Sequence, residues 1–279
     1  MKPAGAIMTA ARTCVRALAD LVLPEVCAAC SSHAASADSL CPDCGKALLA
    51  LVALPYCPRC GATLGPHIPV REDGCSACPT VLPRFSQVVR LGPYTAPLRD
   101  MIHELKYRMR QSMLRRTGKL LAQALARRCE QDPPDLAMPV PMHWRRRMWQ
   151  GYDHARLLAE AVAAELDLPV GDELVRVRNT PPQTSLSRTG RIENVRGAFG
   201  VTSNANLAGA TVLLVDDVTT TGASANEAAR TLLAAGASKV ILAVIAKTEP
   251  PTAYAWDWFQ QDKSGSEHAE PGAESVTSC

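Results

Sequence analysis

Apolar runs and amphipathic stretches alternate between residues 84 and 250 of this 279-residue chain. Short apolar runs predict β-strands at 86–94, 136–144, 211–215 and 239–247. Apolar residues at helical spacing predict helices at 96–110, at 113–129, within 145–166 and at 224–236. Strands that alternate with helices favour an α/β fold with a mostly parallel sheet and flanking helices.

Two of the predicted helices have a clear apolar face. In 96–110 the apolar positions are 98, 101, 102, 105 and 109. The helix at 113–129 is expected to bury its leucines, which are Leu114, Leu120, Leu121 and Leu125. Its other face carries cations, which are Arg115, Arg116, Lys119, Arg127 and Arg128. We expect this helix to pack on the sheet with its basic face in solvent.

The N-terminal segment Met1–Val26 is rich in alanine, and its larger apolar residues recur at roughly helical spacing. Arg12, Arg16 and Asp20 interrupt it, so its longest apolar run is too short for the hydrophobic region of a secretory signal. We therefore predict a short amphipathic helix at 1–23, no membrane insertion and a cytoplasmic location.

Charge is distributed unevenly, although the whole chain has a formal net charge of only +3. Residues 84–156 contain 15 Lys and Arg against 6 Asp and Glu, whereas residues 257–279 contain 1 and 5. The second segment is predicted to be an acidic disordered tail. A basic block of this size often meets phosphate in a nucleotide or a nucleic acid, and a solvated surface is the equal alternative.

Eight of the eleven cysteines form four C-x-x-C pairs. The pairs are Cys27 and Cys30, Cys41 and Cys44, Cys57 and Cys60, and Cys75 and Cys78. Two such pairs complete a tetrahedral zinc site, so the spacing predicts two structural Zn²⁺ ions. A disulfide framework is the alternative and is typical of secreted proteins, while a redox C-x-x-C motif needs a βαβ context that is lacking here.

Short loops close at the least entropic cost, so we pair 27/30 with 41/44 and 57/60 with 75/78. Residues 24–82 are then two tandem zinc ribbons, poor in core-forming residues and held together mainly by metal. Gly45 and Gly61 follow two of the pairs and are expected to permit tight turns. The remaining thiols, Cys14, Cys129 and Cys279, are predicted to be free, and His33 and His67 to be bystanders.

Two neighbouring carboxylates, Asp216 and Asp217, follow the apolar run 211–215, and the sequence TTTG comes shortly after them. Ser224 and Glu227 have the spacing of a capping box at the start of a helix that ends before Gly236. This βαβ unit places its loop at the carboxyl edge of the sheet, where hydroxyls and a helix N-terminus bind anions. A ribose 5-phosphate fits both features, and the P-loop and G-x-G-x-x-G motifs are absent.

The segment VLLVDDVTTTGAS resembles the phosphoribosyl pyrophosphate (PRPP) motif of type I phosphoribosyltransferases. The resemblance extends to the ComF family (ComFC and GntX-like proteins) through LVLPEVCAAC, YTAPLRDMIHELKYR, PVPMHWRRR and PPQTSLSRTGRIENVRGAF. It implies a phosphoribosyltransferase-like domain at 84–250 after the double zinc ribbon at 24–82.

The same resemblance implies roles for individual residues. Asp216 and Asp217 would hold the ribose hydroxyls, directly or through Mg²⁺, at the catalytic centre. The 5-phosphate would be bound by Thr219, Thr220, Thr221, Gly222, Ala223 and Ser224. Val140, Pro141 and Arg147 would lie on the pyrophosphate side. Where the family reads R-G-F-N-Q, this chain has QGYDH, so Gln150 replaces an arginine that would supply a fixed charge.

Residues 181–199 are polar and poorly periodic, which suits a mobile loop over the site, with a plain surface loop as the alternative. Three function classes remain open. One is a competence-type protein for uptake or processing of single-stranded DNA, working with other competence proteins. The others are an active phosphoribosyltransferase that carries out pentosyl transfer and a non-catalytic regulator that senses PRPP or nucleotides.

For nucleic-acid binding, the cationic candidates are Arg108, Arg110, Arg115, Arg116, Arg145, Arg146 and Arg147. Trp144 and Trp149 could stack on bases or, equally, pack against the helices.

Overall fold

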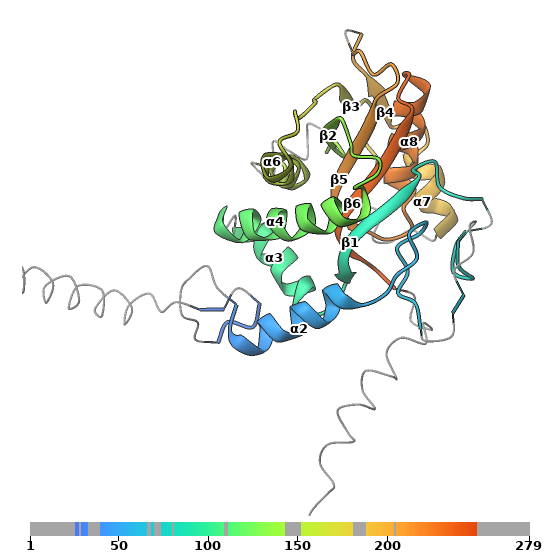
Figure 1. Cartoon of the computed structure of the whole chain (residues 1–279). Coiled ribbons are helices and arrows are strands. Elements are labelled where there is room, and N and C mark those ends of the chain that lie inside the picture. The colour runs from blue at the N-terminus through green and yellow to red at the C-terminus, as the bar shows by residue number, and fades with distance from the viewer. Residues whose placement is uncertain are drawn as a thin grey trace, which may run out of the picture.

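The computed structural model describes residues 26–27, 29–32, 40–65, 68–69, 74–79, 81–108, 111–142, 152–180, 188–203 and 205–249. Its helices are α2 (Pro42–Ala53), α3 (Leu98–Arg108), α4 (Gln111–Arg128), α6 (His154–Leu166), α7 (Arg188–Val195) and α8 (Ala223–Ala234). Its strands are β1 (Gln87–Pro93), β2 (Leu136–Pro139), β3 (Leu174–Arg176), β4 (Phe199–Val201), β5 (Thr211–Thr219) and β6 (Lys239–Lys247) (Figure 1). The predicted helix at 1–23 and the acidic tail at 257–279 lie outside these residues.

A four-stranded sheet in the order β1-β6-β5-β2 forms the centre of the molecule, and all its neighbours are parallel. This confirms the predicted α/β fold with a parallel sheet. β5 is longer than the predicted strand 211–215, because Asp216 and Thr219 continue the ladder opposite Val244 and Lys247 of β6. All four strands end at the same edge, which gathers their carboxyl ends.

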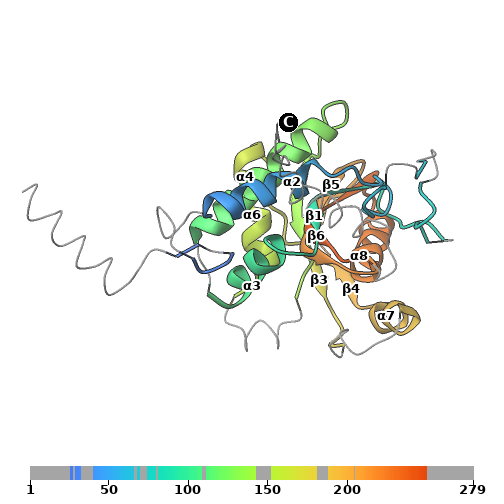
Figure 2. The ribbon, with the colours of Figure 1, turned by 90° about the horizontal axis from the view of Figure 1, so that it is seen from below.

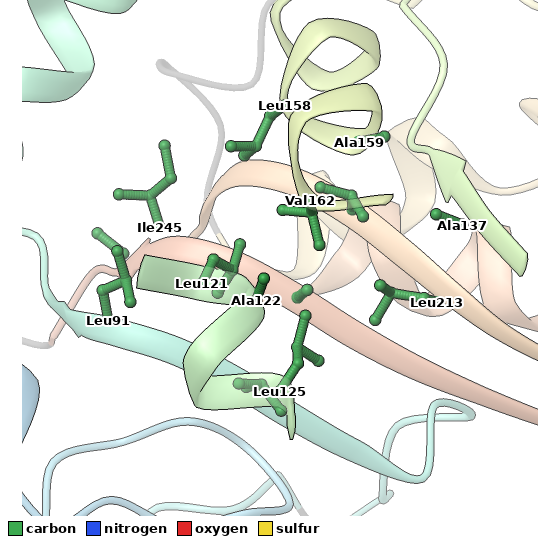
Figure 3. Packing of buried hydrophobic residues seen from close by; sticks show 14 of the residues in the cluster. Leu91, Leu121, Ala122, Leu125, Ala137, Leu158, Ala159, Val162, Leu213 and Ile245 are labelled. Atoms are coloured by element: carbon green, nitrogen blue, oxygen red, sulfur yellow. The ribbon is translucent and has the colours of Figure 1, made fainter. Parts of the chain in front are cut away.

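Helices cover both faces of this sheet, with α3, α4 and α6 on one side and α8 on the other (Figure 2). On the first face, side chains of α4 and α6 pack on the strands, as Leu121, Leu158 and Val162 do in Figure 3. On the second face, α8 and the antiparallel pair β3-β4 enclose a separate apolar cluster. Two dry layers therefore hold the strand ends in a fixed arrangement.

The amphipathic faces read from the sequence are confirmed for α3 and α4. α3 buries its four apolar positions from Leu98 to Leu105. In α4 Leu121 and Leu125 are buried and Leu114 and Leu120 are half-buried, while all five predicted cations are exposed. No helix in the described part of the chain is both long and apolar enough to span a membrane.

The capping box predicted for α8 is wrong. The N-cap residue is Gly222, in the left-handed region at φ 76°, and it makes no side-chain capping bond. The carboxylate of Glu227 instead accepts hydrogen bonds from the backbone N–H of Gly197 at 2.7 Å and from Arg230 at 2.7 Å. The residue after the helix is as predicted, since Gly236 has φ 107° just beyond the C-cap Ala235.

The cysteine-rich segment packs on the sheet more closely than its sequence predicts. Residues 42–53 form α2, whose Leu48 is 5% exposed and belongs to the main core. The expected shortage of core-forming residues is therefore wrong for this stretch. Gly45 lies inside α2 and makes no turn, whereas Gly61 has φ 76° as predicted.

The segment expected to be a loop over the site contains a helix. α7 occupies Arg188–Val195, with Arg191 and Asn194 on it. The remainder of the polar stretch, 181–187, lies outside the described residues. The prediction of an irregular loop is therefore wrong for 188–195, where contacts with α8 supply order that the local sequence does not show.

Candidate functional site

The end of β5 and the start of α8 bring the predicted site residues together at the carboxyl edge of the sheet. Asp216 and Asp217 lie near the end of β5. Residues 219–224, which we term the phosphate loop after the role predicted for them, lead into α8. Gly222 permits the left-handed turn, and the hydroxyl of Thr221 accepts a hydrogen bond from the N–H of Ala223 at 3.3 Å. The positive end of the α8 dipole therefore faces this loop and favours an anion there.

The two aspartates do not share one environment. Asp217 Oδ2 lies 2.8 Å from Nζ of Lys106 on α3, and both side chains are partly exposed. The Asp216 carboxylate accepts a hydrogen bond from the backbone N–H of Asp217 at 2.9 Å. Burial of its carboxyl group, and then the neighbouring charge of Asp217, raise the pKa of Asp216 to about 8. The protonated form of Asp216 is therefore favoured at neutral pH when no ligand is bound.

Lys106 is the partner that the sequence did not reveal. Burial lowers the pKa of Lys106, but the charges of Asp217 and Asp216 and the hydrogen bond to Asp217 outweigh it, so its pKa lies above the ordinary value. The residue stands in the segment YTAPLRDMIHELKYR, directly after the buried Leu105. Nothing in that segment distinguishes Lys106 from other helix lysines, because its contact with Asp217 depends on the tertiary packing of α3.

A second lysine, Lys247, supports the phosphate loop from the end of β6. Its Nζ donates hydrogen bonds to the carbonyl oxygens of Thr220 at 2.5 Å and Thr248 at 2.8 Å. The backbone N–H of Thr248 also bonds the carbonyl of Thr219 at 2.9 Å. These bonds hold the loop against β6 and place a cation beside it. The sequence predicted the strand but assigned no role to its last residue.

Two cavities flank this edge. The one we term the acid-pair cavity has a volume of about 290 Å³ and includes Asp217 and Lys106 among mostly apolar walls. The one we term the ribbon cavity has a volume of about 420 Å³ and is lined by Thr219–Gly222 and, from the cysteine-rich segment, by Cys60, Ala62, Ala77 and Pro79. Asp216 and Asp217 are not among the described residues that line the ribbon cavity. Asp217 therefore lines one cavity and Thr219–Gly222 line the other, while Asp216 lines neither.

The predicted pyrophosphate side is only partly described. Val140 follows β2, is 7% exposed, and donates its N–H to the carbonyl of Val215 at 2.8 Å. Pro141 is half-buried beside it. Arg147 and Gln150 lie outside the described residues, so the role expected for Arg147 stays a prediction.

The eight paired cysteines form two clusters with the predicted sequential pairing. In each, the four Sγ atoms lie within 4.8 Å of one another. Separations of 3.7 Å occur between Cys57 and Cys78 and between Cys60 and Cys75. Four sulfurs bound tetrahedrally at about 2.3 Å from zinc stand about 3.8 Å apart, whereas a disulfide is about 2 Å long. The geometry therefore fits zinc and excludes disulfides among these described cysteines.

Backbone donors around the first cluster fit the same interpretation. The N–H groups of Ala29 and Cys41 approach the sulfur of Cys27 at 3.4 and 3.3 Å. Burial raises the pKa of Cys27, but the backbone hydrogen bonds outweigh it and bring the pKa to about 6. The thiolate that a metal requires is therefore favoured at Cys27. Of the other cysteines, Cys129 is a buried free thiol, while Cys14, Cys279, His33 and His67 lie outside the described residues.

The predicted nucleic-acid surface is represented by the exposed face of α4. Arg115 also lines the acid-pair cavity, and Arg128 stacks over the ring of Tyr56 at 4.2 Å. Cations on α4 therefore extend from the acid-pair cavity to the cysteine-rich segment. The tryptophans 144 and 149, the arginines 145–147 and the side chains of Arg108 and Arg110 lie outside the described part.

Comparisons with known proteins agree with this arrangement. The double zinc ribbon domain family matches residues 18–82, and the phosphoribosyl transferase domain family matches residues 153–272. DNA utilization protein YhgH of Salmonella typhi is 32% identical over 235 residues, which cover 82% of this chain and 99% of that protein. Competence protein F of Haemophilus influenzae is 31% identical over 208 residues, which cover 73% and 88%.

Competence protein ComFC of Bacillus subtilis is also similar, at 27% identity over 203 residues, which cover 71% of this chain and 80% of that protein. The chain therefore belongs to the ComF/YhgH family, whose members join a double zinc ribbon to a phosphoribosyltransferase domain.

Proposed function

We propose that this protein binds PRPP or another ribose 5-phosphate ligand at the carboxyl edge of its sheet. The observation that supports this most strongly is the sequence of sites along one segment, in which an acid pair at Asp216 and Asp217 is followed at once by the phosphate loop. The 5-phosphate would lie against the hydroxyls and N–H groups of the loop, beside Lys247. The sugar hydroxyls would bond the carboxylates.

Ligand binding would change the electrostatics of the acid pair. Hydroxyl donors or a divalent cation stabilise the ionised form of Asp216, whose pKa is otherwise raised to about 8. Carboxylate oxygens are the ligands that Mg²⁺ prefers, so Asp216 and Asp217 would hold it together with the ligand phosphates. When bound, Mg²⁺ would neutralise charge on the pyrophosphate. Lys106 remains positioned to hold Asp217 in the same orientation.

We place this binding in the uptake or processing of single-stranded DNA. The relatives carry the names DNA utilization protein and competence protein F. The exposed cationic face of α4 is the feature of this chain that suits a nucleic-acid backbone. Each cysteine cluster is proposed to hold one structural zinc ion, as its sulfur geometry fits.

Calorimetry of PRPP binding to the full chain, with and without Mg²⁺, tests the proposed site. Asp216→Asn should weaken binding roughly tenfold or more, because a hydrogen bond to a charged group contributes about 1.5–3 kcal/mol. Thr221→Val should weaken the phosphate end independently. Asp132→Asn is a matched control, since that exposed carboxylate pairs with Lys239 instead. Equal affinities in the wild type and Asp216→Asn would show that the pair does not bind the ligand.

The acid-pair cavity favours a second candidate, catalytic pentosyl transfer. Its apolar walls beside Asp217 resemble the surfaces that bind planar organic rings, and would accommodate an acceptor base. Such catalysis requires mainly positioning and stabilisation of charge on the leaving group. Release of pyrophosphate from PRPP in the presence of a panel of bases would support it. If PRPP binds but no base causes release of pyrophosphate, the protein binds PRPP without catalysing transfer.

A further inference from the structure

Cys60 of the second cysteine cluster, with residues next to the cluster, is part of the wall that faces the phosphate loop. Cys60, Ala62, Ala77 and Pro79 line the ribbon cavity on one side, and Thr219–Gly222 line it on the other. The two sides are more than 130 residues apart in the sequence. A zinc ribbon with only a structural role would not need to line the same cavity as a ligand loop, so this placement suggests a further role for the ribbon.

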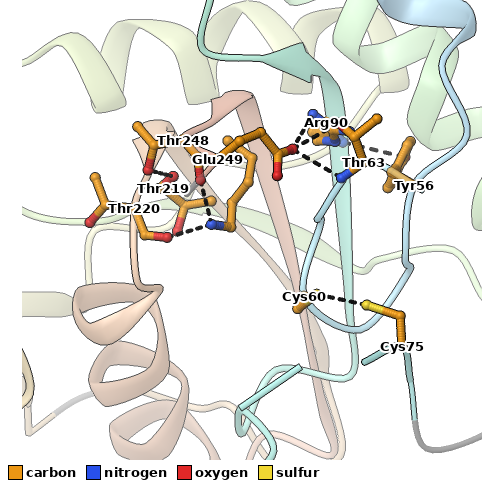
Figure 4. Close-up of polar contacts among 10 residues, drawn as sticks. Tyr56, Cys60, Thr63, Cys75, Arg90, Thr219, Thr220, Thr248 and Glu249 are labelled. Atoms are coloured by element: carbon orange, nitrogen blue, oxygen red, sulfur yellow. Dashed lines mark hydrogen bonds and ion pairs between the residues drawn. The ribbon is translucent and has the colours of Figure 1, made fainter. Parts of the chain in front are cut away.

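A buried ionic network fixes this wall in place (Figure 4). Arg90 of β1 is 2% exposed, donates to the hydroxyl of Thr63 at 2.6 Å, and pairs with Glu249 at 3.6 Å. Glu249 also accepts hydrogen bonds from the N–H and hydroxyl of Thr63 at 2.9 and 2.8 Å. Because Glu249 follows Lys247 and Thr248, the same strand end holds both the ribbon and the phosphate loop.

The ribbon cavity is much larger than a phosphate group requires. Its volume of about 420 Å³ lies in the range of sites for organic ligands, roughly 300–1,000 Å³. Beyond the loop its walls are mostly apolar, from Ala62, Pro79, Pro83 and Phe85. Arg191 and Lys247 bring cations, and Glu249 brings a carboxylate that is already paired with Arg90. Apolar walls with a few charged groups suit a ring attached to a phosphate.

We propose that the ribbon cavity binds the nucleotide on the 5′ side of the ligand phosphate, so that the site takes the 3′-terminal nucleotide of a single strand. This inference rests on the proposed function. With sugar hydroxyls at the acid pair and the phosphate at the loop, the phosphate's remaining oxygen would point toward the ribbon cavity, which Thr219–Gly222 line. A group esterified there enters the ribbon cavity. Free hydroxyls on the sugar then require a strand end.

The test compares ligands that share the terminal ribose 5-phosphate and differ in whether a nucleoside is esterified to that phosphate, which also lowers its charge by one. UMP and the dinucleotide UpU present the same terminal ribose 5-phosphate, and UpU adds one nucleoside beyond it. We expect UpU to bind about tenfold more tightly, which is the effect of stacking one base on a protein surface. A 3′-phosphate on UpU should abolish the gain. TMP and TpT show whether a deoxyribose strand is also accepted.

Ala77→Phe fills the cavity from an exposed position in the Cys75–Cys78 turn. A bulky residue is compatible with such a turn, because Arg59 holds the same position between Cys57 and Cys60. The variant should lose the advantage of UpU and keep the affinity for UMP. Ser76→Phe is the matched control, since Ser76 is an exposed neighbour that does not line the cavity. Zinc content confirms that both variants keep the ribbon.

Each other outcome has a distinct meaning. Equal affinities for UMP and UpU overturn the inference, and so does an equal loss for both ligands in Ala77→Phe, which would make the ribbon only structural. Binding of PRPP without binding of either UMP or UpU also overturns it while the proposed function stands. If PRPP, UMP and ribose 5-phosphate all fail to bind, the proposed function fails first.

Discussion

Asp216→Asn should stabilise the protein when no ligand is bound. The pKa of Asp216 is raised to about 8 in the folded state, from its ordinary value of 3.8. Between these two values the folded chain binds more protons at this site than the unfolded chain does, so the free energy of unfolding falls as pH rises through this window. Asn has no titrating group at this position, so the free energy of unfolding of the variant does not fall with pH for this reason.

The size of the effect follows from the same shift. One pKa unit corresponds to about 1.4 kcal/mol, so the window from pH 3.8 to pH 7 sets an upper bound of about 4 kcal/mol. We expect about 2 kcal/mol, because the strand end can admit water around the carboxylate. For a domain of this size that raises Tm by about 4–8 °C.

Thermal melts in Mg²⁺-free buffer at pH 5 and pH 7.5 provide the assay. The gain in Tm should be larger at pH 7.5, since more of the window has been crossed there. Asp217→Asn is the matched variant and should lower Tm, because it leaves Lys106 without the carboxylate 2.8 Å away. A lower Tm for Asp216→Asn, or a gain that does not grow with pH, would refute the electrostatic account of the pair.

Three further predictions concern the ribbons and the basic face. Glu249→Gln should lower the free energy of unfolding by about 3 kcal/mol, measured by denaturant titration, because it leaves the buried Arg90 without its charge partner. The purified chain should contain close to two zinc ions by metal analysis, and Cys60→Ser should lose about one. Affinity for single-stranded nucleic acid should fall with salt, and replacing Arg115 and Arg116 by Ser should reduce the slope of that dependence.

The outcomes that contradict these predictions are equally specific. Glu160→Gln breaks only an exposed pair with Arg156, so it should leave stability within about 1 kcal/mol, and an equal loss in both Gln variants would refute the buried network. Four disulfides by mass spectrometry would remove the zinc proposal. Salt-independent affinity would show that phosphate contacts do not dominate.

Several features were determined by local sequence because their physical basis is local. The pattern of apolar residues identified β1, β6, α3 and α4. A buried strand needs an apolar run and a helix packed on a sheet needs apolar residues at helical spacing, whichever element each packs against. The C-x-x-C spacing predicted both cysteine clusters, because a turn between two cysteines directs both sulfurs at one metal position. The turn at 219–224 was predictable for the same reason, because Gly222 and the hydroxyl of Thr221 act on the adjacent backbone.

The tertiary structure decided everything that depends on residues far apart in the chain. The partner of Asp217 is Lys106, and the group that anchors Thr63 is Glu249, and neither pairing leaves a periodic signal. Glu227 has the spacing of a capping residue, but a distant N–H at Gly197 and the neighbouring Arg230 hold its carboxylate. α7 forms where contacts with α8 outweigh weak local preference. The local sequence thus identified the candidate site residues, and tertiary packing determined which of them are in contact.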